Sequence, residues 1–120
     1  VASISTISEL KTLIDSSKTD LLIFDLYADW CGPCKVLAPT YASLADQHHT
    51  NARFFRVNVD KSPDIAGAFG VRGIPYVVFV KEGKAVTALT GVNPRESYEK
   101  IIAACGNGVS TISCDQKLKS

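Results

Sequence analysis

Two cysteines separated by two residues, Cys31 and Cys34, are the side chains best suited to carry out chemistry. This spacing brings their sulfur atoms within reach of a disulfide, and Pro33 between them limits how the loop can relax. The pair falls between a predicted buried strand and a predicted helix, where free N–H groups and a partial positive charge favour thiolate over thiol. We therefore expect a redox pair with Cys31 as the exposed nucleophile and Cys34, one turn into the helix, shielded.

The same spacing is also half of a zinc site, which is the alternative to redox chemistry. A closed zinc site needs about four ligands. The remaining thiols and imidazoles are Cys105, Cys114, His48 and His49. They do not form a second pair of matching spacing, so we interpret the first pair as redox-active and predict no metal site.

Composition limits the classes of function that this chain could serve. Its 120 residues fit one domain, and 46% hydrophobic residues are enough for a core. A formal net charge of +1 suggests neither nucleic-acid binding nor a basic membrane-binding patch. The apolar runs around Leu21–Phe24 and Tyr76–Val80 are too short to span a bilayer.

Targeting cannot be read directly from the first residues. No basic and apolar signal stretch opens the sequence. The sequence begins at Val1 and lacks methionine, which is expected of a processed product. Four cysteines are fewer than small secreted scaffolds usually carry, which favours a reducing compartment. We expect a cytoplasmic protein, or an organellar one if a targeting segment was removed before Val1.

The first half of the chain predicts the elements that hold the cysteine pair. Thr6 and Glu9 are spaced as a helix capping box. The apolar run at 21–26 suits a strand buried on both faces, and helical periodicity follows from Cys34, with Pro39 expected to kink that helix. Alternation over 55–59 predicts a further strand, and hence a right-handed parallel crossover.

The second half predicts a hairpin and a final helix. Residues 63–69 suit a short helix. Runs at 76–80 and 85–89, separated by Glu82-Gly83, predict a hairpin. Asn93 followed by Pro94 predicts a helix start with asparagine as the cap, and Gly106 should lie close to its end.

The segment Tyr27-Ala28-Asp29-Trp30-Cys31-Gly32-Pro33-Cys34-Lys35 strongly resembles the active site of the thioredoxin family. Further matches are Asp25, Pro39, Asn58-Val59-Asp60, Gly73-Ile74-Pro75, Gly83 and Gly91. The resemblance covers about residues 5–107. It implies an α/β thioredoxin fold, with a central mixed sheet and helices on both faces. We therefore expect a thioredoxin domain at 1–107 and a C-terminal extension at 108–120, packed on that domain or trailing from it.

The resemblance also implies a reaction. Cys31 would attack a disulfide in a protein substrate, and Cys34 would resolve the mixed disulfide. A thioredoxin reductase would then return the pair to the dithiol state with electrons from NADPH. The chain itself would be a monomer that binds no cofactor. Gly32-Pro33 resembles the reducing branch of the family rather than its oxidases and isomerases. Outside redox catalysis, the alternative function is that of a pure binding protein.

Other matching positions imply supporting roles. A buried Asp25 would exchange a proton with Cys34. Arg56 replaces a lysine common in the family and cannot share that proton, because arginine stays charged. A cis bond before Pro75 would place the Ile74 backbone beside Cys31. The residues expected to contact substrates are Trp30, Gly32, Pro33, Ile74, Pro75, Gly91 and Val92.

The state of the two C-terminal cysteines stays open. Cys105 lies on the apolar stripe of the last predicted helix, which suits a buried structural thiol. Cys114 lies in the extension beyond the usual end of the family. A disulfide between them and a regulatory thiol at Cys114 are both compatible with the sequence.

Overall fold

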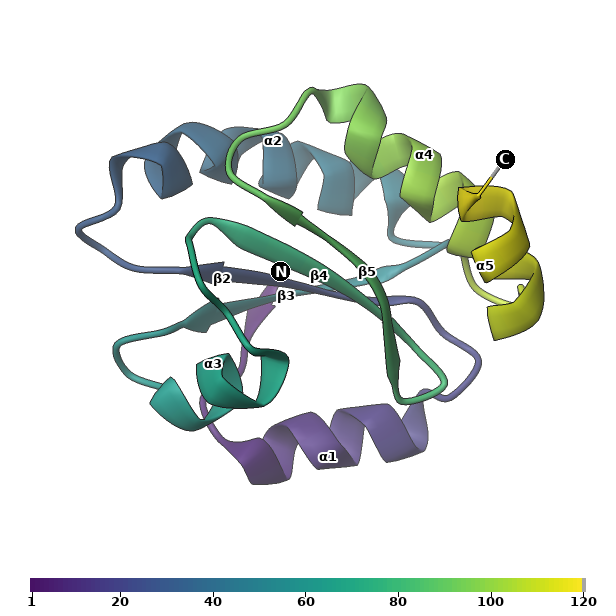
Figure 1. Ribbon diagram of the computed structural model, residues 1–120, viewed down its shortest axis with the longest axis horizontal. Coiled ribbons are helices and arrows are strands. Elements are labelled where there is room, and N and C mark those ends of the chain that lie inside the picture. Colours follow the sequence, from purple (N-terminus) through teal and green to yellow (C-terminus); the bar gives the residue numbers. More distant parts are fainter. Residues whose placement is uncertain (120) are drawn as a thin grey trace.

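The computed structural model describes residues 1–119, so Ser120 of the expected extension lies outside the described residues. The elements are β1 (Ala2–Ser3), α1 (Ile7–Ser16), β2 (Leu22–Tyr27), α2 (Gly32–His48), β3 (Arg53–Asn58), α3 (Pro63–Phe69), β4 (Tyr76–Lys81), β5 (Lys84–Thr90), α4 (Arg95–Cys105) and α5 (Thr111–Leu118) (Figure 1). The strand order is β1-β3-β2-β4-β5. Strands β1, β3 and β2 run parallel, whereas β4 and β5 are antiparallel to their neighbours, which confirms the predicted mixed sheet.

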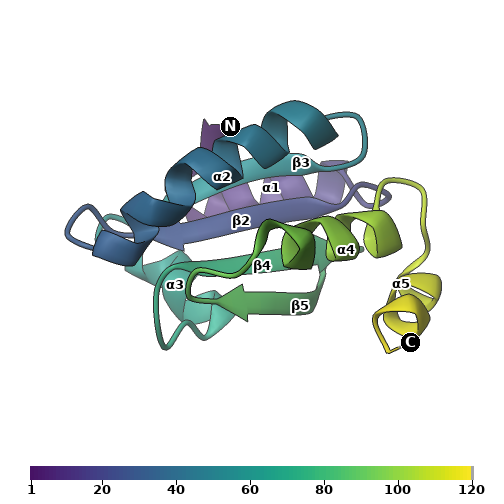
Figure 2. The same ribbon diagram turned by 90° about the horizontal axis from the view of Figure 1, so that it is seen from above.

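Helices cover both faces of this sheet, as predicted. Figures 1 and 2 show α1 and α3 on one face and α2 and α4 on the other. Two separate apolar clusters correspond to these layers, one containing Leu10 and Ile65, the other Leu37 and Tyr98. The hydrophobic effect thus holds each helix pair on its own side of the central strands. No helix among residues 1–119 is long and apolar enough to cross a membrane.

The strand that leads to the cysteine pair is β2, and it is buried on both faces. Leu22, Phe24 and Leu26 belong to the α1–α3 cluster, whereas Ile23 belongs to the α2–α4 cluster. Because side chains alternate along a strand, Asp25 faces the α2–α4 side, like Ile23. A carboxyl group therefore lies in an apolar layer beneath the helix that carries Cys34.

Helix α2 is fixed against the sheet by a buried hydroxyl group. The Tyr41 hydroxyl lies 3.0 Å from the Ile23 carbonyl oxygen and 2.7 Å from that of Phe55, so its proton is shared between two strands. Its ring meets Phe54 edge-on. Pro39 lies inside α2 without ending it. These contacts set the position of α2, and through it the position of Cys34.

Several elements differ from the sequence prediction. Asn93 is not a helix cap: Pro94 takes that place, and the Asn93 amide group instead donates to the carbonyl oxygens of Thr90 and Gly91. The prediction was wrong because asparagine satisfies turn carbonyls as readily as helix N–H groups. Strand β1 and helix α5 were not predicted. By contrast, the capping box is confirmed, since the Thr6 hydroxyl accepts from the Glu9 N–H at 3.1 Å.

The chain after α4 turns back and is joined to α4 by a disulfide between Cys105 and Cys114, whose Cα atoms are 4.6 Å apart. Helix α5 begins at a serine cap, where the Ser110 hydroxyl accepts from the Ser113 N–H. Gly106, between the two helices, lies directly against the Asn51 side chain, so a Cβ atom there would collide with it. The open question about the two cysteines is thus answered by a disulfide.

We predict that replacing both Cys105 and Cys114 by alanine lowers the free energy of unfolding by about 2–4 kcal/mol, because the cross-link restricts the unfolded chain. The measurement is urea denaturation without reductant, in a Cys31→Ser/Cys34→Ser background that leaves one disulfide. The same background treated with reductant separates the cross-link from the packing of the sulfur atoms. Equal midpoints before and after reduction would contradict the prediction.

Candidate active site

Cys31 and Cys34 form a disulfide at the start of α2, with Cα atoms 5.3 Å apart. The β2–α2 loop carries Cys31 to the N-cap position, where its sulfur accepts from the Cys34 N–H at 3.2 Å. The expected contrast in exposure is absent from this disulfide-bonded form, since Cys31 is 3% exposed and Cys34 is 2% exposed. The reason is local packing, because the bonded pair is enclosed with Ala28 and covered by partly buried apolar side chains.

The two cysteines nevertheless border different cavities. Cys31 lines a groove of about 540 Å³. Its other lining residues are Trp30, Gly32, Pro33, Val59, Ala66, Val71, Arg72, Gly73 and Ile74. Cys34 lines a separate cavity of about 790 Å³, which Arg56 and Lys35 also line. A ligand in the first groove therefore meets Cys31, not Cys34.

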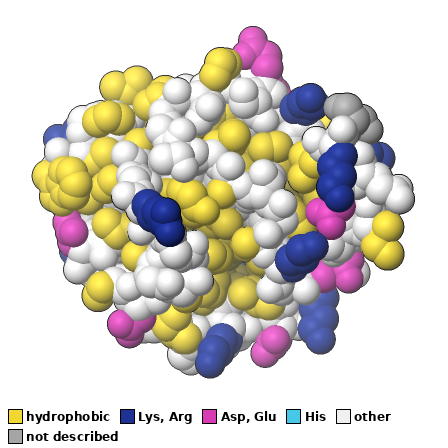
Figure 3. Space-filling view, in the orientation of Figure 1, with side chains coloured by type: hydrophobic (Ala, Val, Ile, Leu, Met, Phe, Trp, Pro, Cys, Tyr) yellow, Lys and Arg dark blue, Asp and Glu magenta, His cyan; other side chains and the backbone are white. Residues whose placement is uncertain are grey.

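The groove beside Cys31 is apolar and exposes an aromatic side chain. Trp30 is 71% exposed, and its indole N–H donates to the Asp60 carboxylate at 2.9 Å. Figure 3 shows apolar side chains gathered on the left of the molecule, the end that carries the β2–α2 loop, and charged ones mainly on the right. An exposed apolar patch of this kind suits contact with another polypeptide.

Four of the predicted contact residues line this groove: Trp30, Gly32, Pro33 and Ile74. Pro75, Gly91 and Val92 do not. The Ile74–Pro75 bond is cis, and the buried Pro75 accepts the Gly91 N–H at 2.8 Å. Val92, the next residue, is exposed. Pro75 follows Ile74 of the groove wall, Gly91 is hydrogen-bonded to Pro75, and Val92 follows Gly91. None of the three forms part of the wall itself.

The opposite wall of the groove was not predicted from the sequence. Ala66 comes from α3, and Val71, Arg72 and Gly73 come from the segment that follows it. Gly70 ends α3 with a φ of 66°, a left-handed conformation that glycine adopts readily. The short helix and Gly70 were visible in the sequence, but nothing in their spacing indicated that they face Cys31.

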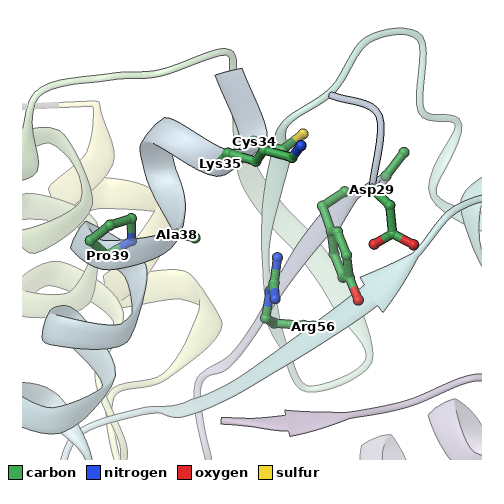
Figure 4. Close-up of a pocket in the computed structure, with 8 residues that line it drawn as sticks. Asp29, Cys34, Lys35, Ala38, Pro39 and Arg56 are labelled. Atoms are coloured by element: carbon green, nitrogen blue, oxygen red, sulfur yellow. The ribbon is translucent and has the colours of Figure 1, made fainter. Parts of the chain in front are cut away.

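Arg56 occupies the cavity beside Cys34. Figure 4 shows its guanidinium group extending from β3 below Cys34 and Lys35, with Ala38 and Pro39 on α2 nearby. The guanidinium carbon lies 3.7 Å from the centroid of the Tyr27 ring, a close cation–π contact. Tyr27 is therefore a platform that fixes the orientation of Arg56.

The group that Arg56 approaches is the carboxylate of Asp25. Arg56 Nε is 3.5 Å from Asp25 Oδ2, and the two residues are paired across β2 and β3. Asp25 is 1% exposed, and its oxygens have no hydrogen-bond partner among residues 1–119. Burial raises the pKa of Asp25 from 3.8 to about 6, although the Arg56 charge opposes that shift. Asp25 therefore gains or loses its proton close to neutral pH, as a proton carrier must.

The thiols and imidazoles that a zinc site would use have other partners in this structure. Within residues 1–119, no three His, Cys, Asp or Glu side chains are arranged to bind a metal ion. All four thiols are in disulfides, and the two histidines have other partners: His48 pairs with Glu99, and His49 contacts the Asp46 carbonyl oxygen. The donor groups that a zinc site needs are thus engaged elsewhere in this form.

Residues 2–104 match the family model described as Thioredoxin. A thioredoxin of Chlorobaculum thiosulfatiphilum is 40% identical over 90 residues, which cover 75% of this chain and 82% of that protein. Thioredoxin-1 of Caenorhabditis elegans is 37% identical over 95 residues, covering 79% and 82% respectively. Among solved structures, Fasciola hepatica thioredoxin superposes with a TM-score of 0.82 at 31% identity, over 88% of this chain and 99% of that one. The observed sheet and helices therefore form a thioredoxin fold.

We predict that a charge-neutral replacement of Asp25 removes part of the pH dependence of stability. The folded protein binds this proton more tightly than the unfolded chain, so the stabilisation is complete below pH 3.8 and is lost as the pH rises through about 6. The difference corresponds to roughly 3 kcal/mol. Urea denaturation of the oxidised protein from about pH 4 to about pH 8 should show this fall in wild type but not in Asp25→Asn.

The matched control is Asp29→Asn, which removes an exposed carboxylate in the loop between β2 and α2. It should retain the wild-type decrease. If Asp25→Asn follows the wild-type curve over the whole range, the carboxyl group does not titrate near pH 6.

Proposed function

Since the chain belongs to the thioredoxin family and is a thiol–disulfide oxidoreductase that reduces protein disulfides through Cys31 and Cys34, we propose that Cys31 is the nucleophile and Cys34 the resolving thiol. The observation that carries this assignment is the difference in surroundings. Cys31 borders the apolar groove with the exposed Trp30, where a polypeptide can approach, and Cys34 faces the cavity that contains Arg56.

The reaction starts from the dithiol form. The Cys31 thiolate attacks one sulfur atom of the substrate disulfide, which forms a mixed disulfide and releases the other substrate sulfur as a thiolate. The Cys34 thiolate then attacks Cys31 Sγ. This step releases the second substrate thiolate, leaves Cys31 and Cys34 in a disulfide, and completes the transfer of two electrons to the substrate. The helix N-terminus stabilises the Cys31 thiolate in the dithiol form, before the first attack.

Asp25 is the proton carrier for Cys34 in this proposal. Its partner Arg56 lines the same cavity as Cys34. Burial raises the pKa of Asp25 to about 6. The carboxylate accepts the Cys34 proton as that thiol becomes the attacking thiolate. Arg56 stays charged throughout, so it stabilises the carboxylate without competing for the proton.

Substrate segments bind in an extended conformation along the groove. Trp30, Gly32, Pro33 and Ile74 supply apolar contacts on either side of Cys31. The Ile74 backbone pairs with the substrate main chain, in a position defined by Pro75. Gly91, tied to Pro75, and the exposed Val92 extend the contact surface beyond the groove.

The partners follow from this chemistry. Disulfide-containing proteins are the substrates, and a thioredoxin reductase regenerates the dithiol with electrons from NADPH, so the chain needs no cofactor of its own. It acts as a monomer, with 1–107 as the catalytic domain and 108–120 as an extension whose described residues, up to 119, pack on it. We place it in the cytoplasm; a relative from Arabidopsis thaliana named Thioredoxin M4, chloroplastic, makes an organelle the alternative.

The first test is the reduction of insulin disulfides with NADPH and a thioredoxin reductase. Wild type should turn over, whereas Cys31→Ser should show no activity above the uncatalysed rate. Cys34→Ser should accumulate a mixed disulfide with the substrate, visible as a mass increase that reductant reverses, because the resolving thiol is missing. Equal residual turnover in the two variants would contradict the assignment of roles.

A second test addresses Asp25. Asp25→Asn should slow resolution of the mixed disulfide by about 10²-fold at neutral pH, because a carboxamide cannot accept the Cys34 proton. The rate should recover at alkaline pH, where the thiol ionises without help. Stopped-flow measurement across the pH range checks this, with Asp29→Asn as the control. An unchanged pH profile would exclude Asp25 from proton transfer.

A further inference from the structure

The second disulfide lies at the opposite end of the molecule from the active site. Figures 1 and 2 show α5 packed beside the end of α4, far along the long axis from the β2–α2 loop. Cys105 is the last residue of α4, and Cys114 lies in α5, outside the region that matches the family model. The Cys31–Cys34 pair therefore cannot reach this disulfide within one molecule.

Both sulfur atoms are sealed from solvent. Cys105 and Cys114 are each 0% exposed and form part of the apolar cluster beneath α2 and α4. Thiol–disulfide exchange requires a thiolate to reach a sulfur atom, so burial prevents it as long as α5 is in place. Cys31, by contrast, borders an open groove. The two disulfides thus have the same chemistry but different access.

The polar contacts between α5 and the β4–β5 hairpin lie at the surface. The Glu82 carboxylate, in the turn between β4 and β5, accepts from the Thr111 N–H at the start of α5, at 3.1 Å. Lys84, at the start of β5, pairs with Asp115 at 3.2 Å. Leu118 packs against the core. Exposed polar contacts stabilise little, and an isolated helix of eight residues is marginal, so we expect α5 to open more readily than the central sheet.

The anchor on the α4 side is much firmer. Lys81 is fully buried, and its ammonium group donates to the carbonyl oxygens of Cys105 and Gly106 at the C-terminus of α4. A cation at this end of a helix is favourable, because the carbonyl groups there carry partial negative charge. Cys105 therefore stays in place when α5 moves, and detachment exposes the disulfide from the Cys114 side.

We propose that Cys105–Cys114 is a second redox site, which exchanges with dithiols only while α5 is detached. A dithiol attacks one sulfur atom as its thiolate, forms a mixed disulfide and releases the partner cysteine as a thiolate. The second thiol of the reductant then displaces the remaining cysteine and closes its own disulfide. Two electrons and two protons pass to Cys105 and Cys114, and α5 loses its covalent link to α4. The reduced Cys31–Cys34 pair of another copy belongs to this class of reductant.

The test is a time course of reduction of the full-length oxidised protein by dithiothreitol. Samples are quenched with an alkylating agent, and mass spectrometry of the peptides measures each cysteine separately. Cys31 and Cys34 should become labelled first, with Cys105 and Cys114 slower by about 10²-fold, because only molecules with α5 open can react. Equal rates for the two pairs would overturn the proposal.

Weakening the attachment of α5 provides the discriminating variant. Glu82→Gln with Asp115→Asn should accelerate reduction of Cys105–Cys114 by about 3- to 10-fold, because it raises the open population, and should leave the Cys31–Cys34 rate unchanged. Asp15→Asn, an equivalent change on the exposed face of α1, is the control. No acceleration in the double variant would mean that α5 does not limit access.

Low concentrations of urea distinguish detachment of α5 from unfolding of the whole domain. If α5 opens alone, the reduction rate should depend on urea far more weakly than global unfolding does, because little surface is exposed. A urea dependence equal to that of global unfolding would overturn the local mechanism. Insulin reduction by Cys105→Ser/Cys114→Ser is measured in parallel, so that a loss of the catalytic function is recognised separately.

Discussion

The position of β2 in the middle of the sheet is the constraint on which the active site depends. This strand is paired on both edges and packed on both faces, so its carboxyl end cannot shift without disrupting both apolar layers. The loop that leaves it brings Cys31 to the N-cap of α2, and the Tyr41 hydroxyl ties α2 back to the carbonyl groups of β2 and β3. The geometry of the cysteine pair is therefore set by the core of the protein.

Asp25 is a buried acidic residue in this otherwise apolar strand, and its surroundings show how the carboxyl group is tolerated. Its carboxyl group gains no hydrogen bond among residues 1–119 and has a single charged neighbour, Arg56, stacked on Tyr27. Burial raises the pKa of Asp25, whereas the Arg56 charge lowers it. Burial has the larger effect, so the pKa is about 6. The active site thus contains a group that destabilises the protein at neutral pH but can carry a proton there.

Local patterns predicted the elements that position the cysteines. The capping box of α1, the apolar run of β2 and the hairpin turn at Glu82-Gly83 each depend on neighbouring residues, and each is present. One miss was a local choice between two hydrogen-bonding roles, and the others depend on contacts distant in sequence. Asn93 satisfies carbonyl groups of its own turn, and the groove wall from Ala66 to Gly73 meets Cys31 only through the fold. The stacking of Arg56 on Tyr27 likewise required β2 and β3 to be paired in register.

The placement of α5 has a practical consequence for anyone who wishes to attach the protein to a surface or a reporter. The β2–α2 loop, which borders the apolar groove, and α5 lie at opposite ends of the long axis, so cargo carried on α5 would leave the approach to Cys31 clear (Figure 1). The disulfide to α4 would keep a load on α5 linked to the folded domain even when the other contacts of α5 open. In a reducing medium the Cys105–Cys114 disulfide would be lost, and the attachment of α5 would become flexible.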